Sequence, residues 1–318
     1  MPLRRIVAIG AFVILSVISL FVGVGELSIV DLVQGSEDAW KLLALSRVPR
    51  TMAIILTATG ASISGLIMQA ISRNKFISPS TSGTTDAALL GLLVGYLLMG
   101  SQPLMVKLLF AFIVALSSTF LFMALLRRIT FKDLIYVPLV GMMYGAVIGA
   151  ATTFIAYRFD ALAVLGSIGV GSFTTMTSGR FELLFVIIPP LIIAFLYASQ
   201  FSLVSLGEDF TKNLGVNYRL IVNLGLLIVA IVAAATFVTV GPLPFVGLII
   251  PNIVASYYGD HLPKSMLDLG LFGASFVLIN DIVSRLVIYP YEVAVSFTMG
   301  ITGGLIFLVL IFKKVHHA

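Results

Sequence analysis

The side chains that most often carry catalysis or bind metal ions are scarce in this sequence. It has no cysteine and three histidines, His261, His316 and His317, none of which falls inside an apolar block. The phosphate-binding pattern G-x-x-x-x-G-K-[ST] is absent, since its nearest approach, 259–265, lacks the glycine before Lys264. The sequence therefore predicts no thiolate or histidine metal site, no histidine proton relay and no ATP site of its own.

Asp86 is a carboxylate whose place in an apolar block makes it a candidate functional residue. Asp86 lies near the start of the block 85–100, where a carboxylate is costly unless it is paired, hydrated or protonated. Two interpretations stay open. Asp86 lines a pathway across the membrane, or Thr84, Thr85 and Asp86 cap the N-terminus of a helix, where side-chain acceptors and negative charge are favoured.

The elements that must position these residues are membrane-spanning helices. Hydrophobic residues make up 59% of the 318 residues, and the mean hydropathy is +1.13. A span needs about 20 mostly apolar residues, and backbone groups in lipid must be paired internally, which favours helices. The apolar blocks that fit are 6–24, 51–71, 85–100, 105–126, 134–156, 181–199, 219–240, 245–258, 266–286 and 293–312. We therefore predict an all-α polytopic membrane protein with one domain, residues 1–318, and roughly ten transmembrane helices of that length.

The charge is arranged as in a membrane protein. The net charge is +5, but Lys and Arg occur singly or in pairs at the edges of apolar blocks, so a nucleic-acid partner is not predicted. With the N-terminus in the cytoplasm, the inside connectors hold most of the basic residues, which is the positive-inside pattern. Both termini are therefore predicted to be cytoplasmic. The first block, 6–24, is predicted to be retained as a span, because it is too long for the apolar region of a secretory signal.

Small residues recur at four-residue spacing in three of the predicted helices. They are Gly91 and Gly95; Gly141, Gly145 and Gly149; Gly300 and Gly304. Such spacing predicts close helix packing, and a sliding or gating surface is the alternative interpretation.

The longest polar connector in the second half of the chain runs over residues 202–218, on the predicted cytoplasmic side. Its core, 206–216, alternates acidic, apolar and basic positions at helical spacing. Two interpretations are open on spacing alone: a short amphipathic helix that docks a soluble partner, or an ordinary solvated connector.

Several motifs stand in an order that is typical of one family. They are Ser46–Thr51 leading into Ser64–Gln69, the stretch Leu206–Val216, the stretch Gly241–Pro251, and a tail with Asp281–Arg285, Pro290–Glu292 and Gly303–Gly304. Together they resemble the FecCD-type permeases of bacterial ATP-binding cassette (ABC) importers, which carry iron-siderophores, haem or cobalamin. Asn252 replaces a histidine that the family usually has, and Asp260-His261-Leu262 replaces its Asp-His-Arg turn. The connector 72–84 is most similar to permeases for catecholate siderophores such as petrobactin.

The resemblance implies a transport subunit rather than an enzyme, located in the bacterial cytoplasmic membrane as a multi-pass protein. It implies a second permease subunit, a paralogue in preference to an identical copy, two ATPase subunits that use the ATP, and an extracytoplasmic substrate-binding protein. The cargo would be a ferric siderophore. No cofactor and no metal ion would be bound by this chain.

The resemblance also implies roles for three groups of residues. ATPase coupling would use Gly207, Glu208, Leu214 and Gly215; docking of the binding protein would use Arg47, Arg50 and Arg285; the translocation pathway would include Met142, Met143, Gly145 and Asp86. Each role has a plainer alternative. The arginines could snorkel to the membrane surface, Arg285 could pair with Asp281 four residues earlier, and the methionines and glycines could serve ordinary packing.

Two other classes of protein compete with the importer subunit. An ion-coupled secondary transporter of a small solute needs membrane carboxylates or broken helices, and Asp86 and the block with Pro251 are candidates. A membrane enzyme needs a catalytic cluster at membrane depth, and none is visible in the sequence. A secondary transporter differs from the importer in its energy source, because it uses an ion gradient without nucleotide.

Overall fold

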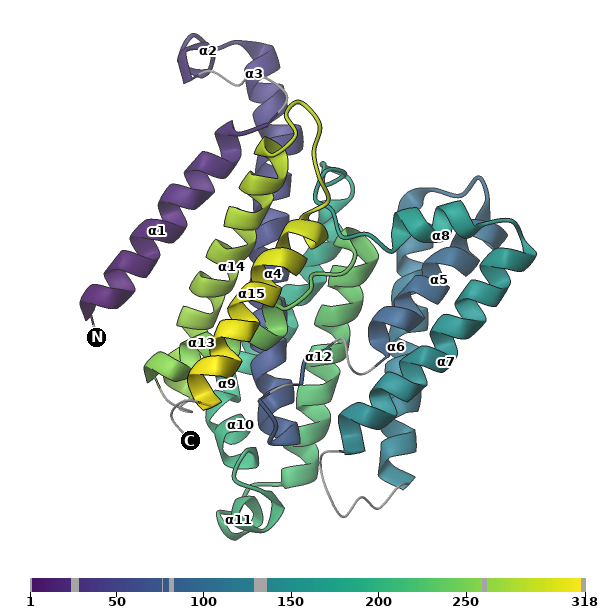
Figure 1. Cartoon of the computed structure of the whole chain (residues 1–318), viewed down its shortest axis with the longest axis vertical. Helices are drawn as coiled ribbons and strands as arrows, with labels where there is room; N and C mark the ends of the chain where they lie inside the picture. The colour runs from purple at the N-terminus through teal and green to yellow at the C-terminus, as the bar shows by residue number, and fades with distance from the viewer. Residues whose placement is uncertain are drawn as a thin grey trace.

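The structure is a computed structural model that describes residues 2–23, 29–75, 77–79, 83–128, 136–258 and 262–315. Its long helices run roughly along one direction (Figure 1). They are α1 (Pro2–Phe21), α4 (Val48–Ser72), α5 (Thr84–Met99), α6 (Leu104–Arg128), α7 (Tyr136–Arg158), α12 (Tyr218–Val240), α13 (Val246–Tyr258), α14 (Leu262–Leu286) and α15 (Val295–Val315).

Shorter helical elements lie between and at the ends of these helices. They are α2 (Ile29–Val33), α3 (Glu37–Leu42), the π-helical turn η1 (Leu43–Arg47), α8 (Leu162–Ile168), the 3₁₀ helix η3 (Phe181–Ile187), α9 (Ile188–Leu196), α10 (Ala198–Val204) and α11 (Glu208–Asn213). The end of the molecule that carries α2, α3 and α8 is called the outer end here, and the end that carries α11 the inner end, following the predicted orientation (Figure 1).

The predicted spans are confirmed as helical segments. Among the described residues, five helices are long and apolar enough to cross a membrane, or six if the bent pair of η3–α9 and α10 is one span. Four shorter apolar helices, in α1, α5, α13 and α15, fall on the remaining predicted blocks. The terminal ends of α1 and α15 both point toward the inner end (Figure 1), as expected for two termini on one side.

The sixth predicted span, 181–199, differs from a straight helix. Pro189 and Pro190 open α9, and proline has no N–H to donate to the preceding turn. The chain before them is a 3₁₀ helix, and a break at Tyr197 bends α9 and α10 apart by 67°. The continuous helix predicted from hydropathy is therefore wrong in shape, although its position in the sequence is right.

The helix α4 is the centre of the packing. It contacts α12, α13 and α14, and most of its length is buried. Glycines permit the closest approaches: a Cβ on Gly65 would lie 1.9 Å from the carbonyl oxygen of Gly247 on α13, and one on Gly273 of α14 would lie 2.1 Å from Ser62 Oγ. Side chains larger than hydrogen at these positions would push the helices apart.

The four-residue glycine pattern has two different outcomes. On α5, a Cβ on Gly91 would lie 2.8 Å from Ala111 of α6, so close packing is confirmed there. On α15, none of the residues that the structure describes lies within 4 Å of a Cβ built on Gly300 or Gly304, so close packing at these glycines stays a prediction. The exposed apolar side chains of α15 and α7 leave these surfaces for lipid or for another subunit.

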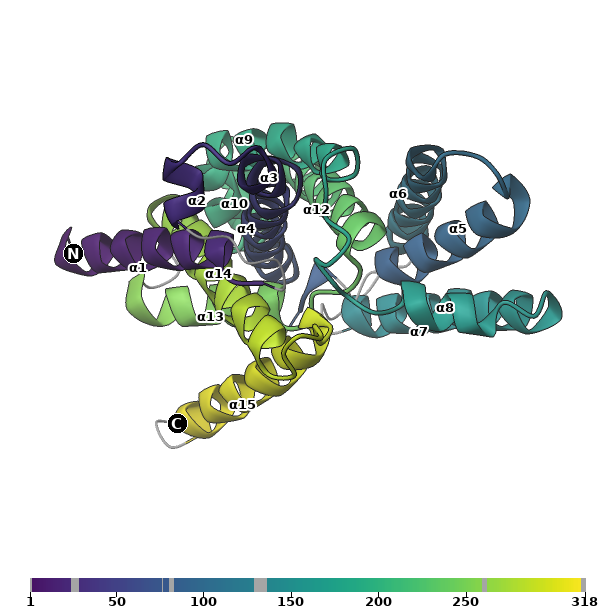
Figure 2. The ribbon, with the colours of Figure 1, turned by 90° about the horizontal axis from the view of Figure 1, so that it is seen from above.

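Two groups of helices are visible when the molecule is seen from the outer end (Figure 2). The helices α5, α6, α7 and α8 form one group, and the helices around α4 form the other. The helix α12 joins them, because it contacts α4 as well as α5 and α6.

Candidate functional site

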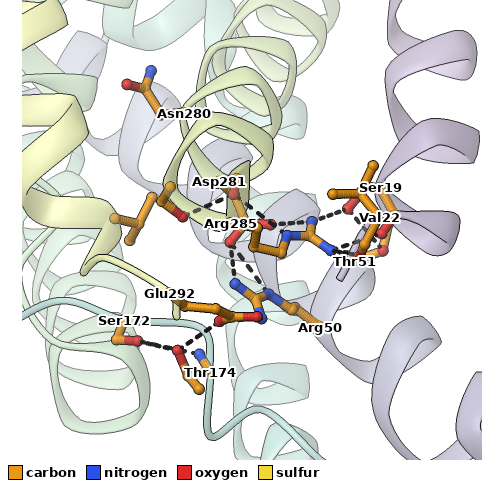
Figure 3. Close-up of polar contacts among 12 residues, drawn as sticks. Ser19, Val22, Arg50, Thr51, Ser172, Thr174, Asn280, Asp281, Arg285 and Glu292 are labelled. Carbon is orange, nitrogen blue, oxygen red and sulfur yellow. Dashed lines mark hydrogen bonds and ion pairs between the residues drawn. The ribbon is translucent and has the colours of Figure 1, made fainter. Parts of the chain in front are cut away.

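The main cluster of buried charge lies at the outer end, where α4 meets α14 (Figure 3). Asp281 and Arg285 share one face of α14, and Arg285 Nη2 donates a hydrogen bond to Asp281 Oδ2. From α4, Arg50 Nη2 and Nε lie 2.8 and 3.2 Å from Asp281 Oδ1. The side chains of Asp281 and Arg285 have no exposed surface, and that of Arg50 is 8% exposed. One carboxylate therefore joins two buried guanidinium groups on two helices.

A second carboxylate completes this arginine–carboxylate network. Glu292 lies in the connector between α14 and α15, and its Oε1 and Oε2 accept hydrogen bonds of 3.0 and 2.8 Å from Arg50 Nη1. Burial is the largest single effect and raises the pKa of Glu292. The charge and hydrogen bonds of Arg50, together with the Thr174 hydrogen bond and the charge of Arg285, nevertheless hold this pKa below its usual value. With Glu292 ionised, Arg50 and Arg285 face two negative charges, so the four groups are balanced.

Glu292 also ties the network to the chain segment that follows α8. Thr174 Oγ1 donates to Glu292 Oε2 at 2.9 Å, and the Thr174 hydroxyl lies 2.8 Å from that of Ser172. The backbone of Ser172 in turn donates to the carbonyl of Val240 at the end of α12. Hydrogen bonds thus link the connector before α15 to the segment after α8 (Figure 3). The backbone bond of Ser172 links this segment to α12.

The same arginines bind the end of α1. Arg285 Nη1 donates to the carbonyls of Ser19 and Val22 at 2.9 and 2.6 Å, and its Nη2 donates to Ser19 Oγ at 2.7 Å. Arg47 Nη1 donates to the Val22 carbonyl at 2.7 Å. Carbonyls at a helix C-terminus have no partner within the helix and carry partial negative charge, so arginine suits both needs. At the inner end, Arg5 pairs with the buried Asp268 at 2.7 Å, so α1 is attached to α14 at both ends.

The predicted coupling residues surround α11 at the inner end. Gly207 and Gly215 flank the helix with φ values of +109° and +77°, in the region that favours glycine. Thr211 is buried and its hydroxyl donates to the carbonyls of Leu203 and Gly207, which anchors the helix to α10. The short helix that the spacing of 206–216 allowed is therefore present.

The outward surface of α11 is apolar with one ion pair. Leu206, Phe210 and Leu214 are each more than half exposed. Glu208 and Lys212, one helical turn apart, lie 2.7 Å from each other, and this hydrogen bond lowers the pKa of Glu208. Three exposed large apolar side chains on a six-residue helix and its flanks are a feature of a docking surface.

The residues predicted for the pathway come from α5 and α7. Met142 and Met143 are exposed on α7, while Gly145 faces α5, where a Cβ would lie 2.5 Å from Asp86 Oδ2. Asp86 stands in the first turn of α5, and the N-cap is Gly83, without a side-chain cap hydrogen bond. Thr84 instead shares a hydrogen bond with Thr119 of α6. Asp86 thus has the position that the helix dipole favours and at the same time packs against α7.

Metal-binding clusters are absent from the part of the chain that the structure describes, where no three His, Asp or Glu residues lie together. The histidines His261, His316 and His317 lie outside that part, as do Asp260 and residues 80–82 of the connector 72–84.

The sequence matches a known protein family over most of its length. Residues 11–313 match the FecCD transport family. The chain belongs to the FecCD family. The match covers most of the sequence, including Arg47, Arg50, Asp281, Arg285 and Glu292.

Two relatives and one solved structure show how far the similarity extends. The FecCD chain is 46% identical to the petrobactin import system permease protein of Bacillus subtilis, over 96% of this chain and 97% of that protein. It is 38% identical to the ferric-anguibactin transport system permease protein of Vibrio anguillarum, over 95% and 96%. A metal-chelate type ABC transporter in an inward-facing conformation superimposes with a TM-score of 0.84 at 25% identity, covering 98% of this chain and all of the other.

The structure brings together the three arginines that the sequence singled out. The alternative for Arg285, a pair with Asp281, is present, and Arg50 shares that carboxylate. Arg47 lies on the same outer end and is 6% exposed. Docking of a binding protein to these arginines stays a prediction, and any docked carboxylate meets arginines of the FecCD chain that already have internal partners.

Sequence reasoning missed Glu292 and the end of α1 as partners of the arginines. The signal in the sequence was the position of the charges. Asp281 and Glu292 fall on the same predicted side of the membrane as Arg50 and Arg285. Burial of charge in a membrane protein requires a partner, but 231 and 242 residues separate Arg50 from its two carboxylates. Spacing along the chain cannot identify such pairs.

Replacing Asp281 by asparagine tests the network. The Asp281→Asn variant leaves Arg285 buried with no carboxylate in hydrogen-bond contact, so we expect a loss of about 3–5 kcal/mol in the free energy of unfolding. The measurement is reversible unfolding of the purified chain in detergent, followed by helical circular dichroism.

The control is Glu37→Gln, which removes the exposed pair of Glu37 and Lys41 at the same end of the molecule. An exposed pair of this kind contributes about 0–1 kcal/mol. Equal effects of the two substitutions would show that the buried network does not stabilise the fold.

Proposed function

We propose that this chain is the membrane-spanning permease subunit of an ABC importer that takes up iron–siderophore complexes. The observation that carries the proposal is 46% identity, over nearly the full length of both chains, to a protein named as a petrobactin import permease. A second relative with 38% identity is named for ferric-anguibactin transport. Both names describe uptake of an iron chelate, which supports a ferric siderophore as the cargo.

The subunit works with ATPases supplied by other chains. The sequence has no phosphate-binding loop, so ATP hydrolysis belongs to two partner subunits. The apolar surface of α11, formed by Leu206, Phe210 and Leu214, supports docking of such a subunit at the inner end. Gly207 and Gly215 give the turns that present the helix, and Glu208 with Leu214 completes the coupling surface.

The exposed face of α7 is our candidate for the pathway. Met142, Met143 and Val147 are exposed there, and Gly145 lets α5 with Asp86 approach. A bulky chelate has to pass without being trapped, which favours a broad surface of flexible apolar side chains over a tight set of ligands. A second permease subunit, a paralogue in our proposal, would supply the opposite wall.

Docking of an extracytoplasmic binding protein is proposed for Arg47 and Arg50. Arginine engages a carboxylate with two parallel hydrogen bonds, which gives geometric specificity. Arg50 is held by Glu292, whose side chain is 13% exposed, so a carboxylate from the partner would compete with Glu292 for Arg50. Arg285, with no exposed side-chain surface, would contribute through the network rather than by direct contact.

Transport driven by ATP is the first test. The chain is reconstituted in liposomes with the ATPase, second permease and binding protein of its own transport system, and uptake of ⁵⁵Fe-labelled catecholate siderophore is followed. We expect uptake only with enclosed ATP. The Glu208→Lys variant puts a cation at the N-terminus of α11, where the helix dipole disfavours it, and replaces the pair with Lys212 by two like charges. Because this reverses a charge on the proposed coupling surface, uptake should fall at least about tenfold, equivalent to about 1.4 kcal/mol.

The matched control is Glu37→Lys, which breaks the other exposed i,i+4 pair, at the outer end on α3. It should leave uptake unchanged. Uptake by the chain alone, driven by an ion gradient without nucleotide, would contradict the proposal and establish a secondary transporter.

Docking at the outer end is tested with Arg47→Ala. The substitution removes a guanidinium, including its hydrogen bond to the Val22 carbonyl, and keeps the side chains of the Arg50 and Arg285 ion pairs. We expect the binding protein to associate at least about tenfold more weakly with the assembled transporter, a change of about 1.4 kcal/mol. Biolayer interferometry at low salt gives the affinity.

The comparison variant is Arg158→Ala, which removes an exposed arginine from the outer end of α7. It should bind like the unaltered transporter. An unchanged affinity of Arg47→Ala at low salt would reject the docking role of Arg47.

A further inference from the structure

A cavity of about 520 Å³ lies at the outer end, apart from the arginine–carboxylate network. Residues of α5, α6, α8 and the end of α12 line it, together with the segment that joins α8 to η3. Most of the wall is apolar, with leucine, valine and isoleucine side chains from these helices. Its polar groups include Tyr96, Lys107, Ser167 and Arg180.

The charge of this cavity is one-sided. The lining residues include two cations, Lys107 and Arg180, and no aspartate or glutamate. Within the described part of the chain, no ion pair is formed by Arg180, and burial alone lowers its pKa, without a contribution from any carboxylate. Lys107 Nζ donates to the carbonyl of Gly100 and lies 5.7 Å from the centre of the Tyr96 ring. A cation in a largely apolar cavity is costly unless an anion compensates it.

A structural role accounts for one hydrogen-bond donor of Arg180. Its Nη2 donates to the carbonyl of Thr239 in the last turn of α12 at 3.2 Å, where a cation is favoured by the helix dipole. A neutral donor such as glutamine could make the same bond. The hydrogen bond therefore explains a donor at this position and leaves the full positive charge without a counterpart, and Arg180 Nε is buried without an acceptor.

We propose that this cavity binds the phosphate group of an anionic phospholipid from the outer leaflet. The position fits a headgroup, because the cavity lies at the outer ends of three apolar helices, and Tyr and Lys at this level are typical of the membrane interface. The apolar wall fits the first part of the acyl chains, and the volume is in the range of small-molecule pockets. Arg180 and Lys107 would bind the phosphate with charge-assisted hydrogen bonds.

A lipid bound there would connect the two groups of helices. The helices α5, α6 and α8 belong to one group, and α12 with Thr239 and Gly241 is the element that joins this group to the helices around α4 (Figure 2). The occupied cavity would thus hold the outer ends of the two groups at a fixed separation, in addition to the contacts of the network on α4 and α14.

Short-chain lipids test the proposal on the full chain, purified in a zwitterionic detergent. Thermal unfolding is followed while dioctanoyl phosphatidylglycerol, dioctanoyl phosphatidylcholine or glycerol 3-phosphate is added. We expect phosphatidylglycerol to raise the unfolding temperature in a saturable way. In Arg180→Gln, which keeps a donor for Thr239, the half-saturating concentration should rise at least about tenfold, the effect of losing one charge-assisted hydrogen bond. Lys107→Gln, at an exposed amine, should show a shift in the same direction, and Arg158→Gln, away from the cavity, none.

Three results would overturn the proposal. The first is that Arg180→Gln and Lys107→Gln both bind phosphatidylglycerol as the unaltered chain does. The second is that phosphatidylcholine stabilises the chain as well as phosphatidylglycerol does. In the third case, glycerol 3-phosphate alone could reproduce the shift at the same concentration, which would assign the site to a soluble anion. If Arg180→Gln fails to fold, Lys107→Gln and the lysine variant Arg180→Lys, expected to retain phosphatidylglycerol binding, decide between these outcomes.

Discussion

Burial of two arginines beside one aspartate is the constraint on which the outer end of this protein depends. Burying a guanidinium in a membrane protein is costly unless the group has a partner. Arg50 and Arg285 therefore fix where α4 and α14 meet through Asp281. Arg285 then holds the end of α1, and Glu292 holds the connector before α15 and the segment after α8. A buried pair contributes little net stability compared with an apolar contact, but breaking it costs several kcal/mol. The network therefore specifies one arrangement of these elements.

The helix α4 connects this network to the inner end. Arg50 lies in its first turn, and Arg73 closes it in a left-handed conformation with φ of +49°. At that end, a Cβ on Gly207 would lie 3.1 Å from Arg73 Nη1, so α4 contacts the segment that carries α11. Between the two ends, the close approach of Gly65 to Gly247 leaves little room for α4 to slide against α13. Movement of α4 as a rigid body would therefore displace the outer network and the coupling segment together.

Hydropathy was sufficient to locate the ten helical segments, because each span must be apolar over a length fixed by the bilayer. It could not give their shape. The bend at Tyr197 depends on the local backbone conformation between α9 and α10, and the open surface at Gly300 and Gly304 depends on which helices become neighbours. The four-residue spacing is the same on α5 and α15. Among the described residues, however, the spaced glycines of α5 approach another helix and Gly300 and Gly304 of α15 do not.

The arginines of the candidate site could be predicted from the sequence, whereas most of their contacts could not. Motif order identified Arg47, Arg50 and Arg285, and the four-residue spacing identified the pair of Asp281 and Arg285. The pairing of Arg50 with Glu292 joins residues on opposite ends of the sequence, and no local pattern encodes it. The short helix of the proposed coupling segment was easier to predict, because the turns around α11 favour glycine at Gly207 and Gly215 and the exposed apolar positions repeat at helical spacing.

A double-mutant cycle between α4 and α14 measures the central interaction most directly. The free energies of unfolding are compared for the unaltered chain, Arg50→Met, Asp281→Leu and the double variant. If the pair holds the two helices together, the double variant will be more stable than the sum of the single effects predicts, by about 1–3 kcal/mol. Additive effects, within about 0.5 kcal/mol, would contradict the role of Arg50 and Asp281 as the contact that fixes the outer end.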